Sequence, residues 1–173
     1  MRRLVAVLVL VYSIQVAPAQ KVRVDFDHAW NFSQYRTYSW SGPPDVDGFN
    51  QLMQERLTGF VEESLAAKGL KHVAANGELL ISCQMNTREE QRYITYSDGF
   101  GGWGWGWDGG RGISTTTADP ILLGTLRLDV VDAHRNRLIF QGTATDSVSS
   151  RPARNTRTLA KSVRKILEKY PPK

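Results

Sequence analysis

GTLRLDVVDAHRNRLIFQGTA, residues 124–144, is the stretch that decides the fold. Apolar side chains alternate with polar ones along its first half, at Leu126, Leu128 and Val130. Alternation of this kind is typical of a strand that buries one face. Residues 132–136 then have the composition of a solvated turn, and residues 137–145 form a second β-prone run. The stretch therefore predicts an antiparallel hairpin that lies over a core.

The segments around this hairpin predict an α+β domain of the order ββαβββα. The expected elements are strand 21–26, strand 35–40, a helix capped by Asp47 and stopped at Gly69, strand 78–93, the two hairpin strands after a β-prone run at 115–117, and a helix 155–170 capped by Asn155. Short connections favour an antiparallel or mixed sheet with both helices packed on one face. The second half of 78–93 is polar, so we expect this strand to leave the core and run into solvent.

Residues 1–19 have the pattern of a secretory signal peptide. The basic, apolar and cleavage regions are Arg2-Arg3, Leu4 to Ile14, and Ala17-Pro18-Ala19. The apolar run is too short to cross a bilayer comfortably, so we do not expect a transmembrane protein. We expect a periplasmic protein in which residues 20–173 form a single domain.

The charge balance of the chain is mildly basic. The formal net charge is +5, and removal of residues 1–19 takes away two arginines and no acid, which leaves +3. This balance points only weakly to acidic partners. For an exported chain we expect no nucleic acid partner.

Cys83 is the single cysteine. It alternates in phase with the apolar residues of its strand, so we expect a buried and inert thiol. A single cysteine excludes an internal disulfide and any site with several cysteine ligands. With no cysteine at the cleavage site, we expect no lipid anchor there.

The segment 97–112 differs from the rest of the chain in composition. It contains eight of the fifteen glycines and three of the five tryptophans, which are Trp103, Trp105 and Trp107. It matches G-x-G-x-x-G at Gly99 and Gly104, but no helix follows, so glycine repetition explains the match. Three interpretations stay open: a lid over the open sheet face, a mobile loop, or rings presented to a sugar or a bilayer surface.

Two groups of acidic residues and histidines resemble metal sites on paper. They are Asp25, Asp27 and His28, and Asp129, Asp132 and His134. No paired histidine spacing supports either group, so we expect no metal and no cofactor. The sequence contains neither a G-x-S-x-G elbow nor a P-loop. If the chain were an enzyme, its candidate carboxylates would be Asp25, Asp27 and Asp129.

The last helix and its lead-in carry a basic face. Its members are Arg151, Arg154, Arg157, Lys161, Arg164 and Lys165. One interpretation is a solvated surface opposite the apolar stripe, with cations near the helix C-terminus favoured by the dipole. The other is contact with an anionic envelope polymer or with lipid headgroups, for which Arg154, Arg157 and Lys161 are the candidate residues.

Five segments of the chain carry a family resemblance when taken together. They are FSQYRTYSW at 32–40, ELLI at 78–81, GTLRLDVVD at 124–132, LIFQGTA at 138–144 and ILEKYPP at 166–172. With these segments the chain resembles a bacterial envelope family, domain of unknown function 4136. Their order and spacing cover nearly all of the chain after residue 19. The resemblance implies an exported periplasmic or outer-envelope protein, with a Gly/aromatic-rich insertion before the G-T-L strand and no established activity or catalytic residues. The family's commoner lipoprotein form has a cysteine at the cleavage site, which this chain lacks.

These observations favour a non-catalytic module of the cell envelope. It would bind an envelope component or a partner protein through its sheet edge or through Trp103, Trp105 and Trp107. The alternative is a hydrolase that acts on envelope glycan or lipid, which would need facing carboxylates in a cleft. A third possibility is self-association through the segment 97–112.

Overall fold

The computed structural model describes residues 20–47, 49–97 and 114–172. Its elements are β1 (Lys21–Phe26), a 3-10 turn η1 (Phe32–Gln34), β2 (Thr37–Trp40), β3 (Asp45–Val46), α1 (Gln51–Ala66), β4 (Lys71–His72), β5 (Leu79–Ser97), β6 (Ser114–Asp132), β7 (Arg137–Ser147) and α2 (Pro152–Leu167). The predicted α+β class is confirmed. The hairpin that the alternating pattern predicted is β6 and β7, joined through the turn at 133–136.

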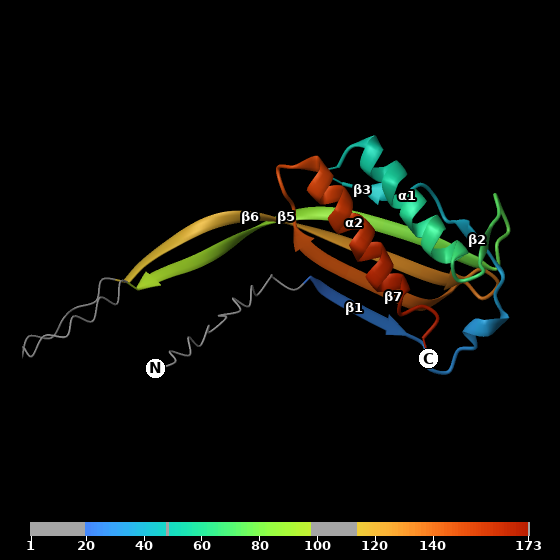
Figure 1. Cartoon of the computed structure of the whole chain (residues 1–173). Helices are drawn as coiled ribbons and strands as arrows, with labels where there is room; N and C mark the ends of the chain where they lie inside the picture. Colours follow the sequence, from blue (N-terminus) through green and yellow to red (C-terminus); the bar gives the residue numbers. More distant parts are fainter. Residues whose placement is uncertain (1–19, 48, 98–113, 173) are drawn as a thin grey trace, which may run out of the picture.

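The strands form one mixed sheet in the order β1-β7-β6-β5-β2-β4, with β3 also paired to β5 (Figure 1). The long central strands β7, β6 and β5 pair antiparallel, as does β1 with β7. The short strands β2 and β3 pair parallel to β5. Two-residue strands such as β3 and β4 have too little pattern to be predicted, which is why they are additions to the expected order.

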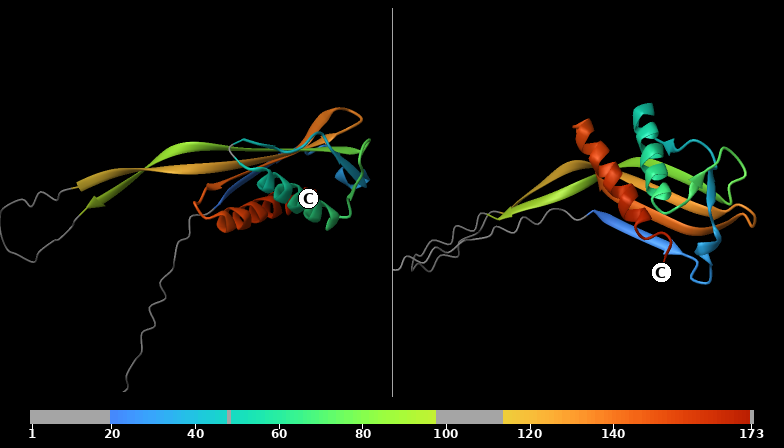
Figure 2. Two further views of the ribbon diagram at one scale, coloured as in Figure 1. Left: turned by 90° about the horizontal axis from the view of Figure 1, so that it is seen from above. Right: turned by 45° about the vertical axis from the view of Figure 1, so that its right-hand side comes forward.

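Both helices cover the same face of the sheet, as Figure 2 shows from above. The core between the two layers is made of alternate strand residues and the apolar stripes of the helices. It includes Ile81 and Leu128 of the sheet and Leu57, Val61 and Val163 of the helices. The opposite sheet face stays uncovered by described residues and is polar, with Gln84, Arg127 and Thr143 side by side on three strands. The described residues therefore enclose one apolar interior, on one side of an open sheet.

The helix ends differ partly from expectation. Helix α1 is capped by Asn50, whose side chain accepts a hydrogen bond from Met53 N at 3.1 Å, so the prediction of Asp47 was wrong. The cap must stand directly before the first turn, and Asp47 is too far upstream. The predicted stop at Gly69 is confirmed by its φ of 82° and by the bond from Leu70 N to Leu65 O at 3.1 Å.

Helix α2 begins earlier than predicted. Pro152 occupies the first turn and Arg151 is the N-cap without a side-chain bond, so Asn155 is not the cap. Proline is well suited to that position because a backbone N–H in the first turn of a helix has no acceptor within the helix, so its absence costs no hydrogen bond. Asn155 instead accepts from Ser149 N and donates to Ser149 O, both at 2.8 Å, and holds the loop before the helix.

Strands β5 and β6 extend far beyond the rest of the sheet. Strand β7 pairs with β6 only as far as Leu123, so residues 89–97 of β5 and 114–122 of β6 form a two-stranded ribbon, here called the arm (Figure 1). Nine residue pairs at about 3.3 Å each give it a length of roughly 30 Å. The predicted exit of the strand from the core is confirmed, since residues 88–93 are exposed.

Candidate binding site

A groove runs between α1 and α2 on the side away from the sheet. Its volume is about 570 Å³. Helix α1 lines it with one face at helical spacing, and α2 does the same, because residues three and four apart share a side. The lining residues are Phe60, Glu63, Ser64, Ala67 and Lys68 of α1 and its end, and Arg157, Ala160, Lys161, Arg164, Leu167 and Glu168 of α2 and its end.

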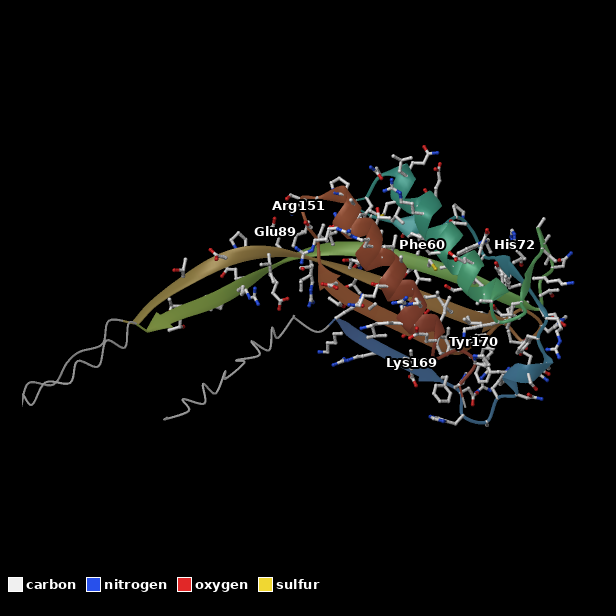
Figure 3. All side chains as sticks on the ribbon, viewed as in Figure 1. Phe60, His72, Glu89, Arg151, Lys169 and Tyr170 are labelled. Atoms are coloured by element: carbon white, nitrogen blue, oxygen red, sulfur yellow. The ribbon has the colours of Figure 1, made fainter. Side chains whose placement is uncertain are left out.

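The groove has an apolar floor and a basic rim. Phe60, labelled in Figure 3, lies on α1 where that helix faces α2, and Leu167 is fully buried below it. Four cations, Lys68, Arg157, Lys161 and Arg164, stand against two acids. One of these acids, Glu168, lies 3.7 Å from the Arg164 Nε. Arg157 and Lys161 have no ion-pair partner among the described residues. An anion with an apolar portion is the ligand class that this lining fits.

The predicted contact residues fall in different places. Arg157 and Lys161 line the groove, whereas Arg154 is exposed on α2 and is not part of its lining. Trp103, Trp105 and Trp107 lie outside the described residues. Lys68 and Phe60 were missed, because the sequence of α1 does not reveal which of its faces meets α2.

The three aspartates considered for catalysis do not form a cleft. Asp25 and Asp129 lie on the uncovered sheet face, on β1 and β6, two strands apart in the row through Gln141. Asp129 is held by Arg127 at 2.9 Å and by the Gln141 Nε2 at 2.9 Å. Asp27 pairs with Arg137 at 2.8 Å. Two of the three are therefore neutralised by cations, which is unlike the facing carboxylates that glycan hydrolysis needs.

A buried polar network closes the end of the sheet near the turn between β6 and β7. Asp132, 2% exposed, accepts hydrogen bonds from the Tyr35 hydroxyl and from the Arg135 backbone N–H at 2.6 Å. Trp30 Nε1 donates to the Tyr35 hydroxyl at 2.7 Å, and the guanidinium groups of Arg135 and Arg137 lie 5.0 and 5.3 Å from the Trp30 ring centre. The expectation of a solvated turn was right for 134–136 and wrong for Asp132.

The pKa values of this network follow from its hydrogen bonds. Burial alone raises the pKa of Asp132, but the bonds from Tyr35 and the Arg135 N–H, together with the Arg135 charge, outweigh it and hold the pKa below its usual value. Burial and the bond to Asp132 raise the pKa of Tyr35. At neutral pH the Asp132 carboxylate is therefore charged and the Tyr35 phenol is neutral, so the hydrogen bond between them stabilises the fold.

The Cys83 thiol is buried in the core, as predicted. Burial raises its pKa to about 12, with a smaller contribution from Asp129. A thiolate is the reactive form of cysteine, so this group is inert in the folded chain.

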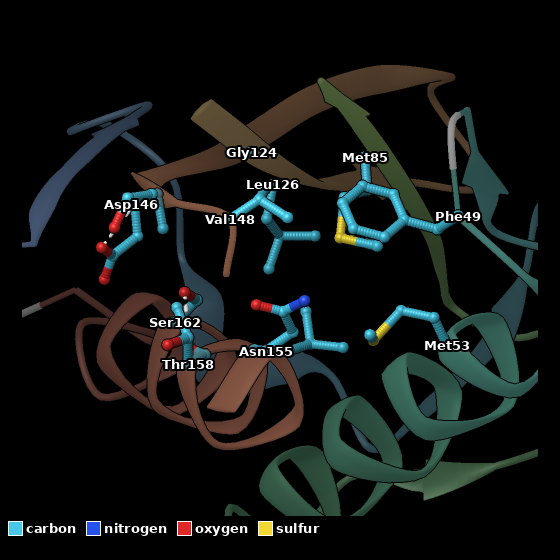
Figure 4. A pocket seen from close by; sticks show the side chains of 13 residues that line it. Phe49, Met53, Met85, Gly124, Leu126, Asp146, Val148, Asn155, Thr158 and Ser162 are labelled. Atoms are coloured by element: carbon cyan, nitrogen blue, oxygen red, sulfur yellow. Dashed lines mark hydrogen bonds between the residues drawn. The ribbon is translucent and has the colours of Figure 1, made fainter. Parts of the chain in front are cut away.

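A narrow, partly open cavity lies where the arm leaves the sheet (Figure 4). Phe49, Met53 and Met85 form its apolar side, while Asn155 and Ser162 of α2 face it with polar groups. Its volume is about 40 Å³, which is room for two or three water molecules and too little for a substrate. Among the described residues, no group of three His, Cys, Asp or Glu side chains is arranged to hold a metal ion.

The fold and these sites define a class: a small α+β domain with an open mixed sheet, two helices on one face and a basic groove between them. The family follows from the sequence. Residues 22–172 match the family described as Domain of unknown function (DUF4136), and the chain belongs to it. The resemblance seen in the five sequence segments is thus confirmed.

Solved structures share this fold at low sequence identity. A DUF4136 family protein from Bacteroides thetaiotaomicron is 14% identical with a TM-score of 0.57, over 90% of this chain and 97% of that one. A PDZ domain protein from Parabacteroides distasonis is 13% identical with a TM-score of 0.58, over 88% of this chain but only 35% of that one. This chain therefore spans about a third of that longer protein.

A third similar structure is PelC from Paraburkholderia phytofirmans, which was determined as a dodecamer. It is 14% identical with a TM-score of 0.51, over 86% of this chain and 95% of that one. A search of curated protein sequences found no match. No helix within the described ranges is long and apolar enough to span a membrane.

Proposed function

We propose that this chain is an exported, non-catalytic module of the cell envelope that binds an anionic envelope component. The observation that carries the proposal is the groove between α1 and α2, where Lys68, Arg157 and Lys161 surround an apolar floor. Cations over apolar surface attract a headgroup phosphate or a carboxylated glycan while the floor takes up apolar atoms of the same molecule. Export rests on the signal pattern of residues 1–19.

A charge-reversal experiment tests the groove. Arg157→Glu and Lys161→Glu are compared with Arg154→Glu, which makes the same charge change on the same helix outside the groove. Binding is measured by cosedimentation with vesicles of phosphatidylglycerol and phosphatidylcholine and, separately, by retention on a soluble uronic-acid polymer. We expect the two groove variants to lose roughly tenfold in affinity and Arg154→Glu to lose less, because Arg154 does not line the groove and would act on a ligand there only through solvent.

The two binding assays distinguish a lipid ligand from a glycan ligand. Binding to vesicles alone supports a lipid headgroup, and binding to the polymer alone supports an acidic glycan. Equal losses for all three variants would mean that only net charge matters and that the groove is not the site. No binding to the vesicles or to the polymer would contradict the proposal of an anionic envelope ligand.

Export is tested by cell fractionation. A chain with residues 1–19 should be found in the periplasmic fraction and a chain without them in the cytoplasm. Substitution of Trp103, Trp105 and Trp107 by Ala, measured for retention in the envelope fraction, tests the proposed contact by these rings. Unchanged retention would exclude them from the binding function.

A further inference from the structure

The outer edge of β5 is open along the arm. Strands β2 and β3 pair with this edge only at Tyr38–Trp40 and at Asp45–Val46, and the last paired residue of β5 is Met85. From there to Ser97, no strand of the described residues pairs with it. An open edge presents a row of backbone N–H and C=O groups that other chains can pair with.

The residues that point their backbone groups outward can be identified. Ile81 O accepts from Ser41 N at 3.0 Å on this outer side. The ladder with β6 is regular from Leu79 to Ser97, so every second residue after Ile81 points the same way. The outward residues of the open edge are Thr87, Glu89, Gln91, Tyr93, Thr95 and Ser97.

The other edge of the arm, on β6, is different. Leu122 O accepts from Val148 N at 2.7 Å, which places the even-numbered residues of β6 outward. Pro120 is one of them, and it has no N–H to donate. Only the β5 edge therefore offers an unbroken row of donors and acceptors.

We propose that this β5 edge pairs with the β5 edge of a second copy of the chain, antiparallel and with Gln91 opposite Gln91. The two arms would then form one four-stranded sheet about a two-fold axis. Gln91 lies six residues from both Met85 and Ser97, so this register uses the whole open edge of each copy. A two-stranded ribbon is marginal by itself in water, and two added strands remove that weakness.

The charge pattern of the arm selects this register. With Gln91 on the axis, Glu90 of each copy stands opposite Arg92 of the other, on the same sheet face. These are closely spaced pairs, because the outward backbone groups belong to the odd-numbered residues, and opposite charges at such positions attract. An axis through Glu90 would place Glu90 against Glu90, and an axis through Arg92 would place Arg92 against Arg92. Both neighbouring registers therefore oppose like charges.

Disulfide capture tests the register. Gln91→Cys places two thiols across the axis with Cα atoms about 5.5 Å apart, which is within the range for a disulfide. Tyr93→Cys is the matched control, because residue 93 lies on the same strand face as residue 91. In the proposed register it lies opposite Glu89 of the second chain, four residues along the strand from residue 93 of that chain. Cys83 does not compete because it is buried.

We expect Gln91→Cys to form a covalent dimer in air and Tyr93→Cys to form no covalent dimer under the same conditions, as judged by non-reducing gels and mass spectrometry. Equal cross-linking of both variants, or none by Gln91→Cys, would overturn the proposed register.

Sedimentation measures the interface without cross-linking. We expect a reversible dimer that weakens roughly tenfold in Glu90→Arg, because two attractive cross-strand pairs become repulsive. Glu90 faces Ile121 across its own arm, and it lies 3.8 Å from Arg88 on the same strand, so the reversal also removes this exposed ion pair. Exposed pairs of this kind contribute little to stability, and circular dichroism checks that the arm is retained.

Gln91→Pro should abolish dimerisation while Gln91→Thr preserves it, since only proline removes an outward N–H. Circular dichroism checks that each variant is folded. A wild-type chain that stays monomeric at about 100 μM, a concentration well above the Kd of specific dimers, would overturn the proposal. Dimerisation unchanged in Gln91→Pro would overturn it too.

Discussion

The network around Asp132 is the most consequential set of single residues in the fold. Replacement of Asp132 by Asn removes the charge that accepts hydrogen bonds from Tyr35 and the Arg135 N–H. We expect a loss of about 2–3 kcal/mol in the free energy of unfolding at pH 7, the usual effect of breaking buried bonds to a charged group. Urea titration measures it, with exposed Asp47→Asn as the control.

The same substitution predicts a pH dependence. The folded pKa of Asp132 lies below the unfolded value, so its stabilisation is present above about pH 4 and is lost as the pH falls through the folded pKa. The stability difference between wild type and Asp132→Asn should therefore shrink on acidification. A difference that is constant from pH 7 to pH 2 would contradict the network as described.

Cys83 gives a second test at this scale. With the pKa raised to about 12, its thiol should not react with a disulfide reagent at pH 8 in the folded chain. In denaturant it should react completely. Absorbance of the released thiolate measures both rates. Rapid reaction without denaturant would show that β5 opens far more readily than a fully buried strand should.

Glycines test the packing of helices at the scale of the element. A methyl group at Gly142 on β7 would collide with the Ile166 side chain of α2, so Gly142→Ala should destabilise the fold by about 1–3 kcal/mol. Gly59, in the middle of α1, has open space around it, so Gly59→Ala should stabilise by up to about 1 kcal/mol. Thermal and urea unfolding measure both. A Gly142→Ala chain as stable as the wild type would contradict the packing of α2 on β7.

Long patterned elements could be predicted from the sequence, and short ones could not. The alternation at Leu126, Leu128 and Val130 predicted β6 because one face of that strand is buried. Strand β3 has two residues and pairs parallel to β5, a contact that depends on distant segments. Asn50 and Asp47 are both good caps, and the choice depends on where the chain turns onto the sheet.

Only one side of the candidate site could be predicted. The basic face of α2 follows from helical spacing, so Arg157 and Lys161 could be named. The α1 side of the groove, with Phe60 and Lys68, depends on how two helices dock side by side, which single-helix periodicity does not encode. The burial of Asp132 could not be predicted either, because its partner Tyr35 is remote in sequence.

At the scale of the whole molecule, body and arm should be separable. Arg88 and Leu123 are paired across β5 and β6, so residues 89–122 can be replaced by an Asn-Gly turn between them. The described arm side chains are mostly exposed, so we expect the free energy of unfolding to change by less than about 1 kcal/mol. Sedimentation of the shortened chain should give a monomer. Loss of cooperative unfolding would contradict the independence of the body.

Pro120 limits how far association through the arms can extend. A sheet with an unpaired edge strand on both sides can add further chains at each edge, which leads to fibrils. In the proposed dimer the β5 edge of each arm is paired, and each outer edge is a β6 strand that contains Pro120. Replacement of Pro120 by a residue with an N–H would turn a self-terminating association into a polymerising one.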